Sequence, residues 1–342
     1  MQQEHTGTSK TKGLAGDFLR VSNYVRERLE IELPENRLAQ VRERVALRMM
    51  ELGIDNWEEY YHQVKYDDTD TEFHRLIALL TPPREGFFNR DPQIACFAEE
   101  VLPYLIETKE DVSYERKLTI WTAGCATGQE AYTLAMLARE ALRGREGWTI
   151  DVIATDLSRA ALFVGEGAAY PVQELTEATE ERIRDHFEIR GESVVIRPEV
   201  RSLVSFSQLN LHRPEELATV RRADVVFCRN VLSLYPEEVR RRVARGFHRA
   251  LSPGGYLFIG NTETLHGVSK AFRLVYFKNA LVYQKDRVKA VSPSDLEMNR
   301  KIELPAHRTA GALVGAADGA SRVMELLGRT VEPEREAITV SG

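Results

Sequence analysis

From Lys117 onward, short apolar runs alternate with helix-like segments, and this alternation constrains the fold more than any other feature of the chain. The runs are LTIWTAG, TIDVIATD, VSFSQLN, DVVFCRN and YLFIGN, and patterns such as EAYTLAMLAREAL and EEVRRRVARGFHRAL separate several of them. Repeated strand–helix–strand units build a parallel sheet with helices on its faces. The final runs, RLVYF and LVYQK, are joined by the short turn KNA and predict an antiparallel hairpin. The sequence therefore predicts a doubly wound α/β fold whose mostly parallel sheet ends in an antiparallel strand.

The N-terminal part of the chain has helical periodicity instead. Asp17 is placed to cap one helix, and Gly53 is placed to end a second one. On the second helix, Arg37, Arg44 and Arg48 fall beside the apolar stripe and form a narrow basic ridge. Such a ridge is either a solvated helix face or a docking surface, and the local sequence leaves both interpretations open.

Changes of pattern divide the chain into segments. In chain order, we predict an unstructured N-terminus at 1–14, a helical domain at 15–80, a linker and first helix at 81–116, the α/β domain at 117–285 and a poorly ordered tail at 286–342. Within the α/β domain, residues 170–205 predict an inserted small β-subdomain, in which a helix over Glu174–Phe187 precedes a hairpin.

Composition argues against several functional classes. The net charge of −6 and the pI of about 5.9 disfavour nucleic-acid binding, which usually requires a basic footprint. No apolar run approaches the ~18 residues of a membrane span, and the N-terminus lacks the apolar core of a secretory signal. The cysteines Cys96, Cys125 and Cys228 are too scattered for a CxxC metal site. We therefore expect a cytoplasmic protein with no metal and no membrane insertion.

The segment AGCATGQE follows a predicted strand and opens a helix. Its glycines, Gly124 and Gly128, allow the backbone to turn tightly and to approach a ligand closely. Glu130 is placed either to meet the ammonium group of a ligand or simply to interact favourably with the helix dipole. Similar turns occur in α/β proteins without a ligand, so this segment alone does not decide between a binding site and a structural turn.

Polar residues close the neighbouring strands. Asp156 ends the second predicted strand, where an acid can accept both hydroxyls of a ribose or cap the next helix. Asn210 and Leu211 end the third, where they flank an adenine or form a plain turn. Arg229 and Asn230 follow the fourth, at the predicted switch point of the sheet. The spacing from the glycine turn to Asp156 exceeds the ~20 residues of a dinucleotide fingerprint, which disfavours NAD.

As an ordered set, GCATGQEAYTLAM, ATDLSRAAL, FSQLNL, FCRNV and LSPGGYLFIGNTETL closely resemble the CheR-type chemoreceptor glutamate methyltransferases. The helices ending LIALLTPPREGFF resemble the N-terminal domain of the same family. The resemblance implies the seven-stranded methyltransferase variant of the fold, S-adenosyl-L-methionine as cofactor, and methylation of glutamate γ-carboxyls on a receptor helix. By position it implies the cofactor contacts Gly124, Glu130, Asp156, Asn210, Leu211, Arg229 and Asn230.

The chain departs from the family pattern where the methyl acceptor is expected to bind. The family usually carries NxTxFFR before the catalytic domain, and the aligned residues here are Pro83, Glu85, Phe87, Phe88 and Asn89. Arg84 and Arg90 lie close enough in sequence to replace the lost guanidinium, or else both are solvated surface residues. The family's tyrosine position holds Leu234, and Tyr235 follows one residue later.

Three functional interpretations follow. The first is a protein-glutamate O-methyltransferase that acts on a chemoreceptor or related signalling protein, with Arg84, Arg90 and Tyr235 facing the acceptor. Its basic ridge, Arg37, Arg44 and Arg48, resembles the helix by which the family meets an acidic receptor bundle. The second interpretation is a non-catalytic or weakly active cofactor-binding docking module. The third is a methyltransferase with a small-molecule acceptor.

Overall fold

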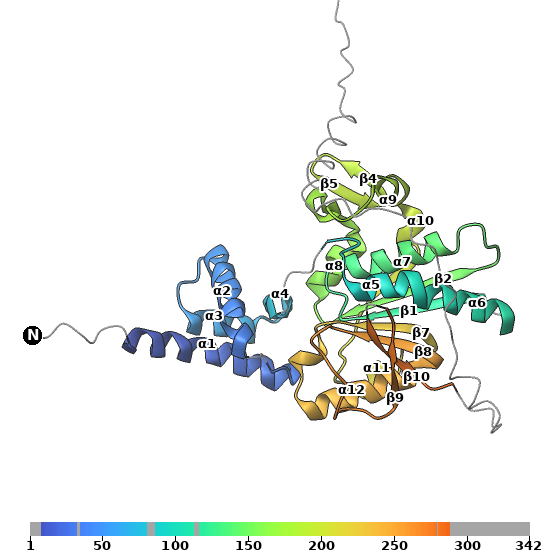
Figure 1. The fold of residues 1–342 in the computed structure, drawn as a ribbon. Helices are drawn as coiled ribbons and strands as arrows, with labels where there is room; N and C mark the ends of the chain where they lie inside the picture. Colours follow the sequence, from blue (N-terminus) through green and yellow to red (C-terminus); the bar gives the residue numbers. More distant parts are fainter. Residues whose placement is uncertain (1–7, 33–34, 81–85, 113–115, 279, 288–342) are drawn as a thin grey trace, which may run out of the picture.

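The computed structural model describes residues 8–32, 35–80, 86–112, 116–278 and 280–287. Figure 1 shows a helical unit, drawn in blue, beside a sheet domain covered by helices. The helical unit contains α1 (Thr8–Leu29), α2 (Glu35–Leu52), α3 (Trp57–Tyr66) and α4 (Thr71–Leu80). Within these ranges, no helix has both the length and the apolar character needed to cross a membrane, and no cluster of side chains suits a metal ion.

The helical unit follows its apolar periodicity. Helix α2 buries Val41, Val45 and Met49, and directly after its last residue comes Gly53, whose φ of +70° favours glycine. One prediction is wrong: α1 begins at Thr8 rather than after Asp17, so part of the segment 1–14 is helical. Polar composition does not prevent a helix when no proline interrupts the segment, so polarity alone does not predict disorder there. The predicted tail lies outside the described residues from 288 onward.

The sheet domain has the predicted doubly wound architecture. Its seven-stranded sheet has the order β6-β2-β1-β7-β8-β10-β9, and β10 is the one strand of this sheet that runs opposite to the other six. The strands are β1 (Lys117–Ala123), β2 (Thr149–Asp156), β6 (Val204–Gln208), β7 (Ala223–Cys228), β8 (Leu251–Ile259), β9 (Phe272–Tyr276) and β10 (Leu281–Lys285). The sheet order reverses between β1 and β7, so the carboxyl ends of these strands form the switch point at which α/β proteins bind ligands.

Helices cover both faces of this sheet (Figure 1). They are α5 (Pro92–Cys96), a π-helical turn (Phe97–Val101), α6 (Leu102–Val112), α7 (Gln129–Ala141), α8 (Arg159–Gly167), α11 (Pro214–Leu217), a short 3₁₀ turn (Leu232–Leu234) and α12 (Glu237–Ala250). Strand β1 sends Ile120 into one core with α7 and Trp121 into the other core with α12. The second core also contains the apolar residues of α1–α4, so the helical unit and the sheet share one hydrophobic interior.

The inserted subdomain carries its own three-stranded sheet, in the order β3-β5-β4. Its elements are β3 (Ala169–Pro171), a 3₁₀ turn (Val172–Leu175), α9 (Glu180–His186), β4 (Phe187–Arg190), β5 (Ser193–Ile196) and α10 (Pro198–Arg201). The predicted hairpin is confirmed by the antiparallel pairing of β4 with β5. The predicted helix over Glu174–Phe187 is too long, because Thr179 caps α9 by accepting from the Arg182 N–H, and β3 was not predicted.

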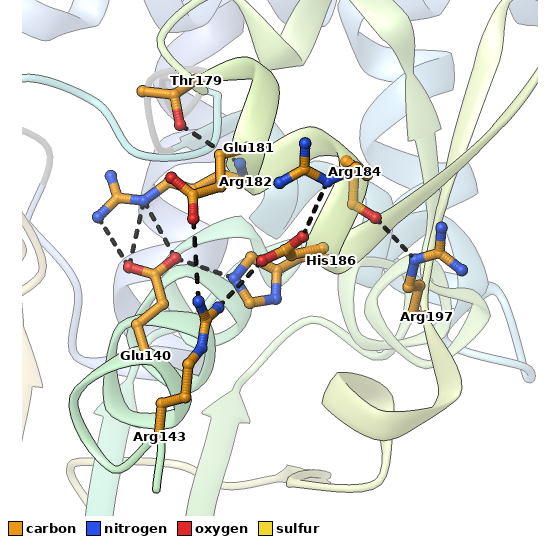
Figure 2. A network of polar contacts seen from close by, with 9 residues as sticks. Glu140, Arg143, Thr179, Glu181, Arg182, Arg184, His186 and Arg197 are labelled. Atoms are coloured by element: carbon orange, nitrogen blue, oxygen red, sulfur yellow. Dashed lines mark hydrogen bonds and ion pairs between the residues drawn. The ribbon is translucent and has the colours of Figure 1, made fainter.

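A polar network joins the subdomain to α7 (Figure 2). Arg182 of α9 makes a fork onto both carboxylate oxygens of Glu140, with its Nη2 2.9 Å from Oε2. The ring nitrogen Nε2 of the buried His186 lies 2.9 Å from Glu140 Oε1. Burial alone raises the pKa of Glu140, but the hydrogen bonds from His186 and Arg182 outweigh it and hold this pKa below its ordinary value of 4.5.

Glu140→Gln is expected to lower the free energy of unfolding at pH 7 by about 2 kcal/mol, because charge-assisted hydrogen bonds are lost. Since the pKa of Glu140 is lowered in the folded state, its stabilisation is present above pH 4.5 and is lost as the pH falls through the folded pKa. Urea unfolding at pH 7 and at pH 3 measures both effects. The exposed Glu188→Gln variant is the control and should match the parent protein, and a deficit in Glu140→Gln that is independent of pH would contradict the prediction.

Candidate functional site

A cavity of about 300 Å³ lies at the carboxyl ends of the central strands, under the helical unit. Strands β1, β2 and β7 lead into it, and the segments after them supply its floor. The helical unit covers the other side with residues of α2 and α4. Its lining is Ile31, Arg44, Ile77, Ala78, Leu79, Leu80, Gly124, Ala126, Thr127, Asp156, Leu157, Ser158, Ala161, Leu209, Leu211, Val231, Leu234 and Tyr235.

The turn after β1 requires glycine for two reasons. Gly124 has a φ of +82°, and a Cβ added there would lie 2.6 Å from Val231 Cγ2. Its N–H donates to the Thr155 carbonyl at 2.7 Å, which ties the turn to the end of β2. Gly128, with a φ of +96°, then starts α7. The predicted glycine turn is thus both a structural turn and the floor of the cavity.

Asp156 faces this cavity from the end of β2. Its Oδ2 accepts the Ala126 N–H and its Oδ1 accepts the Ser158 N–H, both at 2.8 Å. These bonds fix the carboxylate between the glycine turn and the start of α8. Each carboxylate oxygen can accept a second hydrogen bond, so Asp156 can still receive hydroxyl groups from the cavity.

Arg229 is the centre of a buried ionic cluster that the sequence predicted only in part. Its Nη1 lies 2.9 Å from Glu130 Oε2, and its Nη2 is paired with Asp91 Oδ2. The side chains of Arg229, Glu130 and Asp91 are all about one-tenth exposed, at 11%, 9% and 10%. Two carboxylates face one guanidinium, so the cluster carries a net formal charge of −1. Such a charge favours a cationic group nearby.

The remaining predicted cofactor residues divide between the cavity wall and its surroundings. Leu211 lines the cavity, and its contact with the cofactor stays a prediction. The buried Asn210 belongs to an adjacent surface cavity, and its Oδ1 accepts the His212 N–H at 3.2 Å. Asn230 is exposed, with a φ of +60°, and its N–H donates to Glu263 Oε2 at 2.9 Å. These two residues therefore shape the loops around the cavity and are absent from its lining.

The residues predicted to face the methyl acceptor do not lie together in the structure. Tyr235 is buried and lines the cavity, and burial raises the pKa of its hydroxyl well above the ordinary value. Arg90 is 63% exposed, and its Nε lies 2.5 Å from Glu177 Oε2 in the inserted subdomain. Arg90 is therefore absent from the lining of this cavity, and its predicted role at the acceptor stays a prediction. Arg84 lies outside the described residues.

The inserted subdomain holds the segment around Arg90 in place. The Phe87 N–H donates to the Glu174 carbonyl at 2.9 Å, and the Phe88 N–H donates to Thr133 Oγ1 at 3.2 Å. Phe88 has a left-handed φ of +55°, and the Arg182 guanidinium lies 4.4 Å from the centre of its ring. This anchoring turns Arg90 toward Glu177 and gives the physical reason why it does not line the cavity.

The arginines of the predicted basic ridge of α2 have different surroundings, and its role as a docking surface stays a prediction. Arg48 is committed to the helical unit, because its Nη2 lies 2.8 Å from the buried Glu72 and its Nη1 3.0 Å from Glu51. Arg44 lines the cavity instead, and its Nε donates to the Gln40 carbonyl at 3.3 Å. Desolvation, with a smaller contribution from nearby Arg37, lowers the pKa of Arg44.

Sequence reasoning missed two residues that organise the site. Asp91 pairs with Arg229 and also caps α5, accepting the Gln93 N–H at 2.7 Å. Glu263 accepts the N–H groups of Asn230, Ser233 and Gly260 at 2.8–2.9 Å and so fixes the loop after β7. The signal for Asp91 was its place before Pro92, a typical helix start. Glu263 stands in a quoted motif, LSPGGYLFIGNTETL, but carried no local signal of its role.

Comparison with known proteins identifies the family to which the chain belongs. The profile of the CheR methyltransferase SAM-binding domain matches residues 84–281, and that of the CheR all-alpha domain matches residues 16–81. The chain belongs to the CheR methyltransferase family. The family's cofactor, S-adenosyl-L-methionine, is therefore the cofactor of this chain.

The names of similar proteins agree with this family assignment. Chemotaxis protein methyltransferase 1 of Pseudomonas aeruginosa is 28% identical over 273 residues, which are 78% of this chain and 97% of that protein. Chemotaxis protein methyltransferase 2 of Vibrio cholerae is 24% identical over 270 residues, covering 79% and 92%. A solved O-methyltransferase family protein from Burkholderia thailandensis has a TM-score of 0.35 at 14% identity, covering 73% of this chain and 72% of that one.

Proposed function

We propose that this chain transfers a methyl group from S-adenosylmethionine to the γ-carboxylate of glutamates on a helical chemoreceptor or a related cytoplasmic signalling protein. The observation that carries the proposal is the cavity, whose lining brings the glycine turn, Asp156 and Tyr235 together with Arg44 of the helical unit. The relatives' names, chemotaxis protein methyltransferase, support a signalling protein as the acceptor.

The residues present fit the cofactor. Asp156 would accept the ribose hydroxyls, and the apolar side chains of Leu157 and Leu211 would contact the adenine. The turn at Gly124 leaves no Cβ in the way, and the negative cluster of Arg229 with its two acids would attract the cationic cofactor. Asn210 and Asn230 would hold the surrounding loops. When bound, the cofactor supplies an electrophilic methyl carbon on a sulfonium.

The chain's own residues then have a positioning task. A glutamate acceptor is ionised at neutral pH, so no strong general base is required. Because burial raises its pKa, the Tyr235 hydroxyl stays protonated and can donate a hydrogen bond to the acceptor carboxylate. The Arg44 guanidinium offers a counter-charge from the helical unit. Alignment of the acceptor with the methyl carbon is the main contribution to the rate.

Incubation of the full chain with labelled S-adenosylmethionine and a panel of receptor cytoplasmic fragments tests the proposal. We expect base-labile methyl esters on receptor glutamates. Binding of the cofactor without transfer to any receptor would overturn it and favour the docking-module alternative, which the outward orientation of Arg90 motivates. Transfer to small carboxylic acids alone would favour a small-molecule acceptor.

Substitution of two arginines, one in the cavity and one at the surface, tests which of them contributes to methyl transfer. Arg44→Ala should lower kcat/KM for methyl transfer about tenfold, because it removes a charged group from the cavity wall. Arg90→Ala should change it less than about twofold, because exposed ion pairs contribute little. The affinity for S-adenosylhomocysteine, measured by calorimetry, reports whether either change acts through the cofactor. Equal losses in both variants would contradict this assignment.

A further inference from the structure

A second cavity lies at the edge of the sheet opposite to the cofactor site. It occupies about 790 Å³ where β7 and β8 begin, between α11 and α12. The same two strands end at the other edge, beside Arg229 and Gly260. Six cationic side chains line this cavity: Lys109, Arg221, Arg222, Arg242, Arg245 and Arg249. We call it the arginine cavity.

Only one carboxylate lines the arginine cavity, and it is already neutralised. The Oδ1 of Asp224 lies 2.9 Å from Lys109 Nζ, and its Oδ2 accepts the Thr119 N–H at 2.9 Å. Arg242 is paired with Glu30 of the helical unit. Among the described residues, no carboxylate forms an ion pair with Arg245 or Arg249. Positive charge is thus concentrated here in a chain whose net charge is −6.

Three of these cationic residues lie on one face of α12 and line the arginine cavity from that helix. Arg242, Arg245 and Arg249 are spaced i, i+3 and i+7 on α12, which places them on one face. Gly246 lies on the same face, and a Cβ there would come within 2.5 Å of Leu217 Cδ1. The glycine therefore lets Leu217 pack closely against α12, and Leu217 and Leu251 line the same cavity as the arginines and give it an apolar floor.

We propose that the arginine cavity binds a nucleotide carrying two or more phosphates. Guanidinium groups match phosphate oxygens in bidentate geometry, and their planes stack on aromatic bases. The volume lies within the range of about 300–1,000 Å³ that is typical of small-molecule sites. A cavity that combines an apolar floor with several arginines suits a base and its phosphates, whereas inorganic phosphate would leave the floor uncovered.

The test must exclude nucleotide binding in the cofactor site, which also accepts an adenosine group. Calorimetric titration of the full chain with ATP, ADP and AMP is therefore done with saturating S-adenosylhomocysteine. We expect ATP and ADP to bind at least tenfold more tightly than AMP, with an affinity that falls as the salt concentration rises. Loss of ATP binding in the presence of S-adenosylhomocysteine, or equal affinity for AMP, would overturn the proposal.

Charge reversal on α12 identifies the site. Arg245→Glu and Arg249→Glu should each weaken ATP binding about tenfold or more, because each removes a charge-assisted contact and adds repulsion. The matched control is Arg241→Glu on the same helix, since Arg241 is exposed, paired with Glu237 and absent from the cavity lining. It should change ATP affinity less than about twofold. An equal effect of all three, or of none, would overturn the assignment of the ligand to this cavity.

Discussion

Asp156→Ala is expected to raise the dissociation constant for S-adenosylmethionine about a hundredfold. The carboxylate lines the cavity at the end of β2 and, in our proposal, accepts the ribose hydroxyls. Two hydrogen bonds to a charged acceptor contribute together about 3 kcal/mol, which corresponds to this change in affinity. Calorimetric titration with S-adenosylmethionine measures it directly.

The same carboxylate holds the N–H groups of Ala126 and Ser158, so a control for local structure is necessary. Asp151→Ala removes an acid from the same strand, where its pair with Lys117 is exposed. This control should leave cofactor affinity unchanged. The thermal midpoint of each variant without cofactor separates loss of fold from loss of binding. A fold-intact Asp156→Ala whose affinity falls less than fivefold would refute the ribose assignment.

The sheet and its cavity floor were predictable because their signals are local. Strands such as β1 and β7 are buried on both faces and therefore read as continuous apolar runs. Gly124 and Asp156 follow two parallel strands, and parallel strand ends meet at one edge of a sheet. Their common location in the cavity follows from topology alone, before any side-chain contact is known.

The acceptor side was not predictable in the same way, because it depends on contacts between distant segments. Glu177 and the inserted subdomain set the direction of the Arg90 side chain. Arg48 forms an ion pair with Glu72 of another helix. Arg44 faces the cavity only because the helical unit packs on the sheet. Helical periodicity places Arg44 and Arg48 on one ridge of α2 but carries no information about their partners.

Arg229→Met is expected to lower the free energy of unfolding by about 3–5 kcal/mol, as is typical when one partner of a buried ionic group is removed. The substitution keeps an unbranched apolar stem but leaves Asp91 and Glu130 facing each other, with only 10% and 9% of their side chains exposed. Arg213→Met is the matched control, since its pair with Glu216 is largely exposed and should contribute less than about 1 kcal/mol. Urea unfolding of both variants measures the difference.

Neutralising the two acids distinguishes uncompensated charge from lost packing. If the loss arises from unpaired carboxylates, the triple variant Arg229→Met, Asp91→Asn, Glu130→Gln should be more stable than Arg229→Met alone, although it carries more substitutions. If packing of the arginine stem dominates, the triple variant will be less stable than the single one. Cofactor affinity should be lower in the triple variant than in the parent protein, because the net negative charge that would attract the cationic cofactor is gone. Recovered stability with weakened binding would thus assign the Arg229 cluster two separate roles, one in holding α5 and α7 to the end of β7 and one in binding.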